Sequence, residues 1–346
     1  MSPRPMSVLP CFKYLFSPMP CLRAAHTILL TLLPFLAQAQ TQSALHPASD
    51  DASRIAEISW VLFIGSAVIF LLVISVLALA LYGPRRIRDP LSQRTLILGA
   101  GIAFPIVVLS ALLVYSLDVK TSAFTDTPPA VRIEVTGEMW WWRVRYLDQD
   151  GQLMFETAND IHIPAGLPVE FLLKSDNVIH SFWVPNLAGK LDMIPGRVNS
   201  LRVQANEPGL FRGQCAEYCG AQHAKMMFHV HVLRPADFQA WLEAQQQPAI
   251  EPTDAFLLAG KAIVMQACVQ CHAIRGTEAN GALGPDLTHI GSRTSLGAGV
   301  LHNSLGALAG WTVDSQQIKP GNHMPSFDQW TGQELRAVAH YLDSLK

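Results

Sequence analysis

A chain of 346 residues is long enough for two or three domains. Half of its residues are hydrophobic and only 15% are charged, a balance that is unusual for a soluble protein and indicates membrane segments. The formal net charge of -2 and the lack of a Lys/Arg block with interleaved aromatic residues exclude nucleic acid as a partner.

The first 39 residues are predicted to be a signal peptide. Basic residues precede an apolar run at 28–36, and Ala37-Gln38-Ala39 has the small-x-small pattern of a cleavage site. The run is too short to span a membrane, which takes about 20 apolar residues. Cleavage after Ala39 would remove two of the six cysteines and leave those at positions 215, 219, 268 and 271.

Residues 40–118 are predicted to form a transmembrane hairpin. Two uncharged apolar runs, at about 58–82 and 96–117, are each long enough to cross a bilayer as a helix. Arginines in the loop between them place that loop in the cytoplasm by the positive-inside rule, so both flanks lie on the opposite side. A cleaved export signal requires the same orientation. The loop arginines are Arg85, Arg86, Arg88 and Arg94.

Residues 119–243 carry a strand pattern. Apolar and polar residues alternate at 131–136, 201–204 and 228–232, and Gly and Pro mark the turns between such segments. Several short strands of this kind predict a small antiparallel barrel or sandwich. His229 and His231 lie on the polar face of the last segment, which favours a solvent-facing or supporting role over metal ligation.

A short loop within this region, 215–226, is rich in soft metal ligands. Thiolate beside imidazole selects copper, or zinc where the site is structural, and a thioether is a weak axial ligand of copper electron-transfer sites. Two cysteines that bridge two coppers would leave each copper one imidazole and one axial donor, either Met226 or the main-chain carbonyl of Glu217. A zinc site and a disulfide are the alternatives. The side-chain donors, including one histidine from upstream, are Cys215, Cys219, His223, Met226 and His180.

The C-terminal part carries a second signature. Cys268-Val-Gln-Cys271-His272 is the C-x-x-C-H attachment motif of c-type haem, in which the cysteines form two thioethers and the histidine becomes an axial iron ligand. Met324, which precedes a proline, is the expected second axial ligand, and His323 is its rival. All four remaining cysteines therefore have a proposed role, and no disulfide is predicted.

The metal loop, together with 178–185 and 190–197, resembles subunit II of haem–copper cytochrome c oxidases. The resemblance implies a cupredoxin-like barrel with a dinuclear copper centre, CuA, whose ligands are the donors above, with Glu217 acting through its carbonyl. Beyond a linker at 244–253, residues 254–346 resemble a class I cytochrome c, an all-α domain in which the Pro285 carbonyl orients His272. This combination resembles subunit II of the caa-type oxidases.

The resemblance implies three further points. Trp140 matches the tryptophan at which electrons enter from cytochrome c, although two neighbours differ from the family pattern and a structural aromatic cluster is the alternative. Neighbouring strand residues point to opposite faces, so at least one ring of 140–142 should lie at the surface or at a junction.

The Glu217 side chain would reach a magnesium ion shared with subunit I, or would be solvated. Leu98 stands where the family usually has a glutamate near a proton-uptake path, so that role is not implied here.

The sequence as a whole predicts an electron-relay subunit in a bacterial cytoplasmic (inner) membrane, with its copper and haem domains on the periplasmic side. Electrons would pass from an external cytochrome c or another respiratory donor to the haem, then to CuA, then to subunit I for oxygen reduction coupled to proton translocation. Subunits I and III and the lipid bilayer are the implied partners. A CuA-containing nitric-oxide reductase and a free-standing membrane-anchored electron carrier are the alternatives, because the final acceptor lies in another chain.

Overall fold

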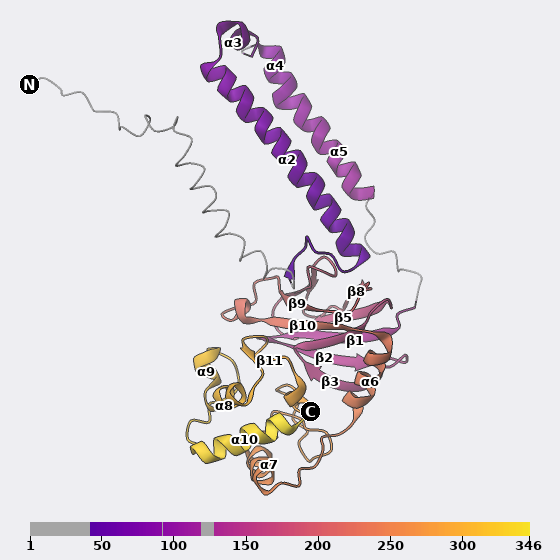
Figure 1. Cartoon of the computed structure of the whole chain (residues 1–346), viewed down its shortest axis with the longest axis vertical. Helices are drawn as coiled ribbons and strands as arrows, with labels where there is room; N and C mark the ends of the chain where they lie inside the picture. The colour runs from indigo at the N-terminus through magenta and orange to yellow at the C-terminus, as the bar shows by residue number, and fades with distance from the viewer. Residues whose placement is uncertain (1–41, 92, 119–127) are drawn as a thin grey trace, which may run out of the picture. The chain divides into compact units, whose positions relative to one another are not determined.

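The computed structural model describes residues 42–91, 93–118 and 128–346. The predicted signal peptide lies outside these residues and stays a prediction. Within them, two helices are long and apolar enough to cross a membrane, and the apolar stretch of each is unburied. Short helix α3 connects them (Figure 1). The first is α2 (Asp50–Tyr82), α3 is Arg85–Leu91, and the second comprises α4 (Arg94–Leu98), a π-helical turn (Gly99–Ala103) and α5 (Phe104–Asp118).

The first membrane helix begins earlier than its apolar run predicted, at Asp50 rather than near residue 58. Ser49 caps it, since its Oγ accepts a hydrogen bond from the Ala52 amide at 3.0 Å and donates to the Leu187 carbonyl of the β domain. Ala52 and Ala56 are buried. These first turns carry polar residues with one buried face, so hydrophobicity alone could not reveal them.

Ten strands build two five-stranded sheets, as the cupredoxin-like expectation requires. The sheet orders are β3-β2-β1-β5-β8 and β4-β10-β9-β6-β7. Two strand pairs, β1 with β5 and β10 with β4, are parallel, so the domain is not purely antiparallel as the alternation alone suggested. The strands are β1 (Val131–Glu138), β2 (Trp141–Leu147), β3 (Leu153–Ala158), β4 (Asp160–Pro164), β5 (Val169–Ser175), β6 (His180–Trp183), β7 (Leu191–Met193), β8 (Asn199–Val203), β9 (Gly209–Cys215) and β10 (Met227–Leu233).

The core of this domain is aromatic. Burial alternates residue by residue along β5, as a strand with one covered face requires. The Trp142 ring meets the Phe228 ring edge-on, with centroids 4.9 Å apart, and Phe228 stacks on Phe182 at 4.6 Å. These rings come from β2, β10 and β6, so they join the two sheets.

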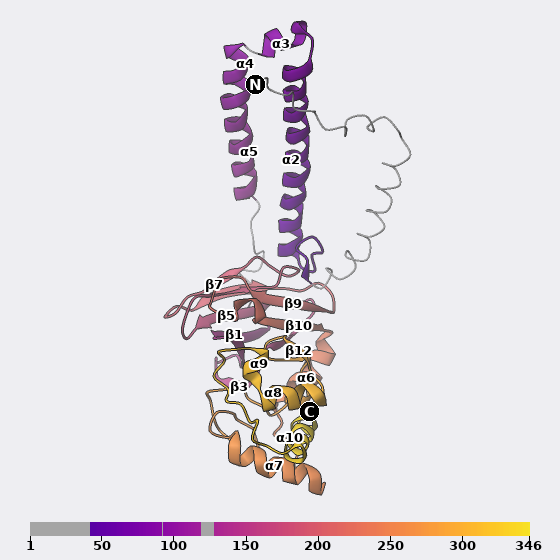
Figure 2. The same cartoon turned by 90° about the vertical axis from the view of Figure 1, so that its left-hand side faces the viewer.

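The C-terminal domain is helical, as its resemblance implied. Its first helix, α7, packs against its last, α10, and the two lie side by side in both views (Figure 1, Figure 2). The crossing is close, because a Cβ on Gly260 would lie 2.1 Å from the Ala337 carbonyl oxygen. Thr331 and Glu334 form the capping box that opens α10. The helices are α7 (Ala255–Ala267), α8 (Leu305–Val313), α9 (Ser315–Ile318) and α10 (Gly332–Ser344), and a two-stranded hairpin joins β11 (Ser295–Leu296) to β12 (Leu301–His302).

The segment predicted as a linker, 244–253, is bound to the C-terminal domain. Helix α6 (Pro235–Gln246) extends into it. The Ala249 amide donates to the Arg275 carbonyl at 2.9 Å, and the Arg275 guanidinium donates back to the Gln245 carbonyl at 2.7 Å. A polar composition predicted an unattached segment because the residues that bind it lie further along the chain.

The helix crossing gives a stability test. Gly260→Ala should destabilise the C-terminal domain by about 1–3 kcal/mol, because the added methyl group meets backbone that cannot move aside. Gly310→Ala in α8 is the control, since a Cβ added there would have no neighbour within 4 Å outside its own helix backbone, and alanine favours a helix by about 0.5–1 kcal/mol. Calorimetric unfolding measures the melting temperatures of both variants. Equal melting temperatures would contradict the close packing of α7 on α10.

Candidate metal centre and haem site

Two buried sulfur atoms form the middle of the first site. The Sγ atoms of Cys215 and Cys219 lie 3.8 Å apart, and the two side chains are 4% and 2% exposed. A disulfide needs about 2.05 Å, so the pair are two free thiols, and the disulfide alternative is not what the structure shows. Two thiolates at this separation could serve the same metal centre.

The other predicted donors surround this pair. His180 Nδ1 lies 3.8 Å from Cys215 Sγ, and His223 Nδ1 lies 3.6 Å from Cys219 Sγ. Met226 Sδ is 3.7 Å from Cys219 Sγ, and the Glu217 carbonyl oxygen is 3.2 Å from Cys215 Sγ. The structure therefore brings together all six predicted donors. Two thiolates, two imidazoles and two weak donors would suit two copper ions better than one tetrahedral zinc ion.

His180 is held with one nitrogen toward the sulfurs. Its Nε2 lies 3.0 Å from the Asn177 side-chain oxygen, which accepts the ring proton and leaves the Nδ1 lone pair free for a metal. Its ring packs against Gly137 of β1, where a Cβ would lie 2.8 Å from two ring carbons. Only glycine at position 137 leaves room for the ring in this position.

The loop is fixed at both ends by backbone hydrogen bonds. The Cys215 amide donates to the Met226 carbonyl at 2.9 Å, and the Ala216 amide donates to the Ser181 carbonyl at 3.0 Å. Gly220 adopts a φ of +111°, which favours glycine, and lets the chain turn back toward β10. The donors thus come from a closed loop between β9 and β10 and from the start of β6.

The two cysteine sulfurs shift each other's pKa in opposite directions. A hydrogen bond from the Cys219 thiol lowers the pKa of Cys215, against the effect of burial. The pKa of Cys219 is raised, because its thiol donates to Cys215 and because burial disfavours a second charge. A bound cation would displace the second proton, so metal binding and deprotonation are linked.

The Glu217 carboxylate lies at the surface. Its side chain is 46% exposed, and its Oε2 lies 3.6 Å from Lys190 Nζ, which also donates to Asp192 at 2.8 Å. The predicted magnesium contact of this carboxylate is not tested by these contacts and stays a prediction.

The haem signature has the hydrogen bond that its family resemblance implied. His272 Nδ1 donates to the Pro285 carbonyl at 2.7 Å, which leaves Nε2 available to iron. The ring lies against Gly284, where a Cβ would be 2.5 Å from Cε1. Burial lowers the pKa of His272, so the neutral ring needed by a metal is favoured. Cys268 and Cys271 are both free thiols.

The two candidates for the second axial ligand differ in burial. Met324 is half-buried and His323 is exposed. The Met324 backbone is fixed, because its amide donates to the Asn322 side chain at 2.8 Å and its carbonyl accepts from Gln316 Nε2 at 2.9 Å. These contacts favour Met324, and its ligand role stays a prediction.

Trp140 lies at the junction of the two domains. The run of three tryptophans predicted that at least one of the rings would lie at the surface or at such a junction. Its indole Nε1 donates to the Cys219 carbonyl at 2.8 Å, and a Cβ on Gly220 would lie 3.1 Å from its ring. On the C-terminal domain, a Cβ on Gly321 would lie 3.7 Å from the same ring. Trp142 is a core residue, and Trp141 packs on the Arg143 guanidinium at 4.7 Å.

Sequence reasoning missed the residue that joins the domains most closely. Lys319 is 2% exposed, and its Nζ donates to the carbonyls of Trp140 at 2.6 Å, Lys225 at 2.7 Å and Gly297 at 2.8 Å. Burial lowers its pKa to about 7, and the nearby Cys219 acts in the opposite direction. No local pattern marks this lysine, since a single charge before Pro-Gly normally indicates a surface turn.

His229 and His231 are not solvent-facing. Their rings contact the C-terminal domain, where Thr294 Oγ1 lies 2.9 Å from His231 Nε2 and Ser295 Oγ lies 3.4 Å from His229 Nδ1. Buried Asp160 completes the cluster and accepts from the Thr294 amide. The polar strand face left a solvent-facing or a supporting role open, and these contacts exclude the first, because the domain that covers the face lies more than sixty residues further along the chain.

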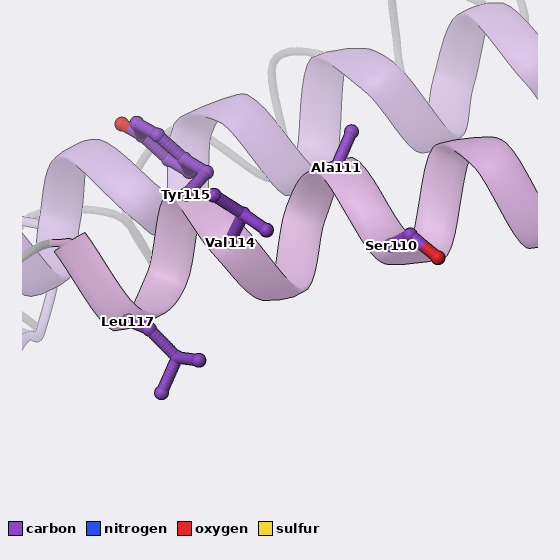
Figure 3. A pocket seen from close by; sticks show the side chains of 5 residues that line it. All are labelled: Ser110, Ala111, Val114, Tyr115 and Leu117. Carbon is purple, nitrogen blue, oxygen red and sulfur yellow. The ribbon is translucent and has the colours of Figure 1, made fainter.

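The surface also has a shallow hollow on the second membrane helix (Figure 3). It lies entirely on α5 and includes none of the proposed ligands. Its lining residues are Ser110, Ala111, Val114, Tyr115 and Leu117.

Two protein families match the chain. Residues 143–233 match the family described as cytochrome c oxidase subunit II, periplasmic domain, and residues 257–346 match the family described as cytochrome c. The first match includes every proposed copper donor, and the second includes the haem signature and Met324.

Relatives that match about two thirds of the chain agree with these family matches. The chain is 38% identical over 250 residues to cytochrome c oxidase subunit 2 of Alkalihalophilus pseudofirmus, covering 70% of this chain and 71% of that one. It is 32% identical over 229 residues to cytochrome c oxidase subunit 2 of Bacillus sp. strain PS3, covering 62% of each. Among solved structures, the periplasmic domain of cytochrome oxidase subunit II of Bradyrhizobium japonicum is 29% identical, with a TM-score of 0.32, over 34% of this chain and 95% of that one.

The packing of His180 predicts a loss of copper on substitution. Gly137→Ala should push the ring away from Cys215 and lower the copper bound per chain, while the fold is kept. Gly189→Ala is the matched control, because its Cβ would make only an ordinary contact, 3.7 Å from Ile55. Metal analysis together with circular dichroism measures both, and full copper in Gly137→Ala would contradict the role of this packing.

The second axial ligand can be identified by paired substitutions. Met324→Ala should abolish the weak sulfur-to-iron absorption band of the oxidised haem and lower its reduction potential, because methionine ligation raises that potential. His323→Ala should change neither, since that side chain is exposed. The opposite pattern in the two spectra would assign the ligand to His323.

Proposed function

The chain belongs to the cytochrome c oxidase subunit II family, and we propose that it passes electrons from its own haem domain, through Trp140, to a dinuclear copper centre at Cys215 and Cys219. The chain is membrane-anchored and carries a copper-binding and a haem-binding domain, and it is the electron-accepting subunit of an oxidase. What the proposal adds is the order of the cofactors, the residues that hold them and the contact through which they communicate.

One observation carries this proposal. The indole of Trp140 is hydrogen-bonded to the carbonyl of Cys219 and packs against Gly321, three residues before Met324. Electron tunnelling weakens steeply across empty space and much less through covalent bonds, hydrogen bonds and close contacts. A path of this kind therefore leads from a proposed copper ligand to the loop of the proposed haem ligand.

Bound copper and haem would supply one-electron transfer without the making or breaking of covalent bonds. The residues of this chain contribute a rigid surround. His180 is fixed by Asn177 and Gly137, and the loop is closed by the hydrogen bond between Cys215 and Met226. A donor set that barely moves when its charge changes lowers the reorganisation required for each electron, which is the purpose of pre-organised polar groups.

Burial of Trp140 supports the order of transfer. The side chain is 9% exposed, because the segment around Gly321 covers it. An external donor therefore meets the haem domain before it can reach the ring. We propose that an external cytochrome c, or another respiratory donor, reduces the haem and that the haem alone reduces the copper.

An exposed ring on the copper loop supports transfer to a neighbouring subunit. Tyr218, between the two cysteines, is 74% exposed, and its ring centroid is 5.8 Å from that of His223. An exposed aromatic ring beside a proposed ligand is a suitable contact for another protein. We propose that this protein is subunit I and that Glu217 contributes to a magnesium ion shared with it. The complex would also contain subunit III. It would couple oxygen reduction to proton translocation in the bacterial cytoplasmic (inner) membrane.

The route is tested by paired tryptophan substitutions in the assembled oxidase. Trp140→Ala should slow the first-order transfer from haem to copper by at least about tenfold, equivalent to about 1.4 kcal/mol in the barrier. Trp141→Ala is the control, because its neighbour is Arg143 rather than a proposed ligand. Flash photoreduction measures the rate, and absorption spectra show whether both centres are intact. Equal rates in the two variants would exclude Trp140 from the route. A wild-type rate that falls on dilution would exclude the fused haem as the donor.

A further inference from the structure

The ammonium group of Lys319 has all of its hydrogen-bonding capacity used inside the junction. A lysine ammonium carries three N–H donors and no acceptor. Here each donor has one main-chain carbonyl, at 2.6 Å for Trp140, 2.7 Å for Lys225 and 2.8 Å for Gly297. Lys319 is therefore satisfied as completely as its chemistry allows, although it is almost fully buried.

The three acceptors belong to three different segments. Trp140 precedes β2, Lys225 precedes the proposed ligand Met226, and Gly297 lies in the turn between β11 and β12. Two of these segments are in the copper domain, and the third shares a domain with Lys319. One side chain thus binds the tryptophan, the end of the copper loop and its own domain at a single point.

Two further contacts place the same strip of backbone on the copper loop. Gln222 Nε2 donates to the Pro320 carbonyl at 2.8 Å, and Lys225 Nζ donates to the Ile318 carbonyl at 2.8 Å. These carbonyls flank Lys319 on both sides, and Gly321 follows at the ring of Trp140. Residues 318–321 therefore lie along the copper loop, immediately before the Met324 segment.

A buried charge is a costly way to make two domains adhere. In the part of the chain that the structure describes, no carboxylate forms a salt bridge with Lys319, and the three carbonyls replace its hydration. Apolar residues would give adhesion with less desolvation but would tolerate sliding. Three directed donors are satisfied in one arrangement only, which suits a group that sets register.

We propose that Lys319 is the positioning residue that sets the register of the haem domain on the copper loop, so that the Trp140 ring is held against Gly321 while its indole reaches Cys219. This inference rests on the proposed route from haem to copper. It assigns Lys319 no contact with the electrons themselves. Its effect is on how often the two domains are in the arrangement that transfers them.

Lys319→Met in the assembled oxidase tests the proposal, because methionine keeps most of the volume and removes all three donors. Two measurements are made. Hydrogen exchange of the Met227 amide reports docking, since this amide donates across the junction to the Ala298 carbonyl at 3.0 Å. The first-order rate from haem to copper after flash photoreduction reports the route.

We expect the Met227 amide to exchange at least about tenfold faster and electron transfer to slow to a similar degree, because three carbonyls lose their donors. The haem spectrum and the melting temperature of the haem domain should stay as in the wild type, which separates positioning from folding. Lys319→Gln keeps two of the donors, so its exchange rate and its electron-transfer rate should lie between those of the wild type and those of Lys319→Met. It replaces Lys319→Met as the test if that variant fails to retain haem.

Two lysines serve as controls. Lys225→Met removes one exposed hydrogen bond at the same junction and should have a much smaller effect on both measurements. Lys261→Met lies on α7, where its ammonium pairs with Glu251, and should leave both unchanged. Wild-type exchange and rate in Lys319→Met, or equal losses in Lys225→Met and Lys319→Met, would overturn the inference. Absence of haem-to-copper transfer in the wild type would instead overturn the proposed function, and the exchange measurement would still decide the positioning role.

Discussion

The close approach of two cysteine sulfurs, 3.8 Å apart and nearly without solvent, is the constraint on which the rest of the copper domain depends. Two thiolates at that distance repel each other, and two thiols there lose their hydration, so the chain must hold them by other means. It does so with the ladder of β9 and β10 on one side and with β6 on the other, where Phe182 pairs with Cys215. The aromatic core behind them, centred on Trp142, keeps those strands from moving apart. A sandwich of ten strands therefore serves to fix one short loop.

The junction between the domains is polar, as contacts within a chain commonly are. Asp160 illustrates how its charges are accommodated: burial acts to raise the pKa of this carboxyl, but the nearby His229 ring, at 3.5 Å, and a hydrogen bond from the Thr294 amide outweigh it and lower the pKa. Arg143 contributes in a similar way, since it pairs with Glu138 and Glu156 and donates to the Ala282 carbonyl of the haem domain at 2.9 Å. Such contacts are directional, so they define how the two domains fit together.

The sequence was most informative where the chemistry is local. Cys215, Cys219, His223 and Met226 lie within twelve positions, and Cys268 to His272 within five, so spacing alone predicted two cofactor sites, and the structure gathers the copper donors. It was least informative where a residue takes its meaning from a distant partner. Lys319 resembles any surface lysine until three carbonyls from elsewhere surround it. The residues 247–253 resemble a free tether until the Arg275 carbonyl binds the Ala249 amide. The start of α2 resembles a polar loop, although one of its faces is buried.

That start of α2 has a consequence for distance. The helix has 33 residues and is therefore about 50 Å long, whereas the hydrocarbon core of a bilayer is about 30 Å thick. Its first turns pack on the copper domain through Ser49 and Ala52. One continuous helix, a rigid rod, therefore starts at the β domain and continues as the membrane helix. Such a rod acts as a spacer, because inserting or deleting one turn would change its length by about 5.4 Å. Under the proposed function the copper centre passes electrons to a neighbouring subunit, and tunnelling rates depend exponentially on separation, so the length of this helix would then bear on the rate of that transfer.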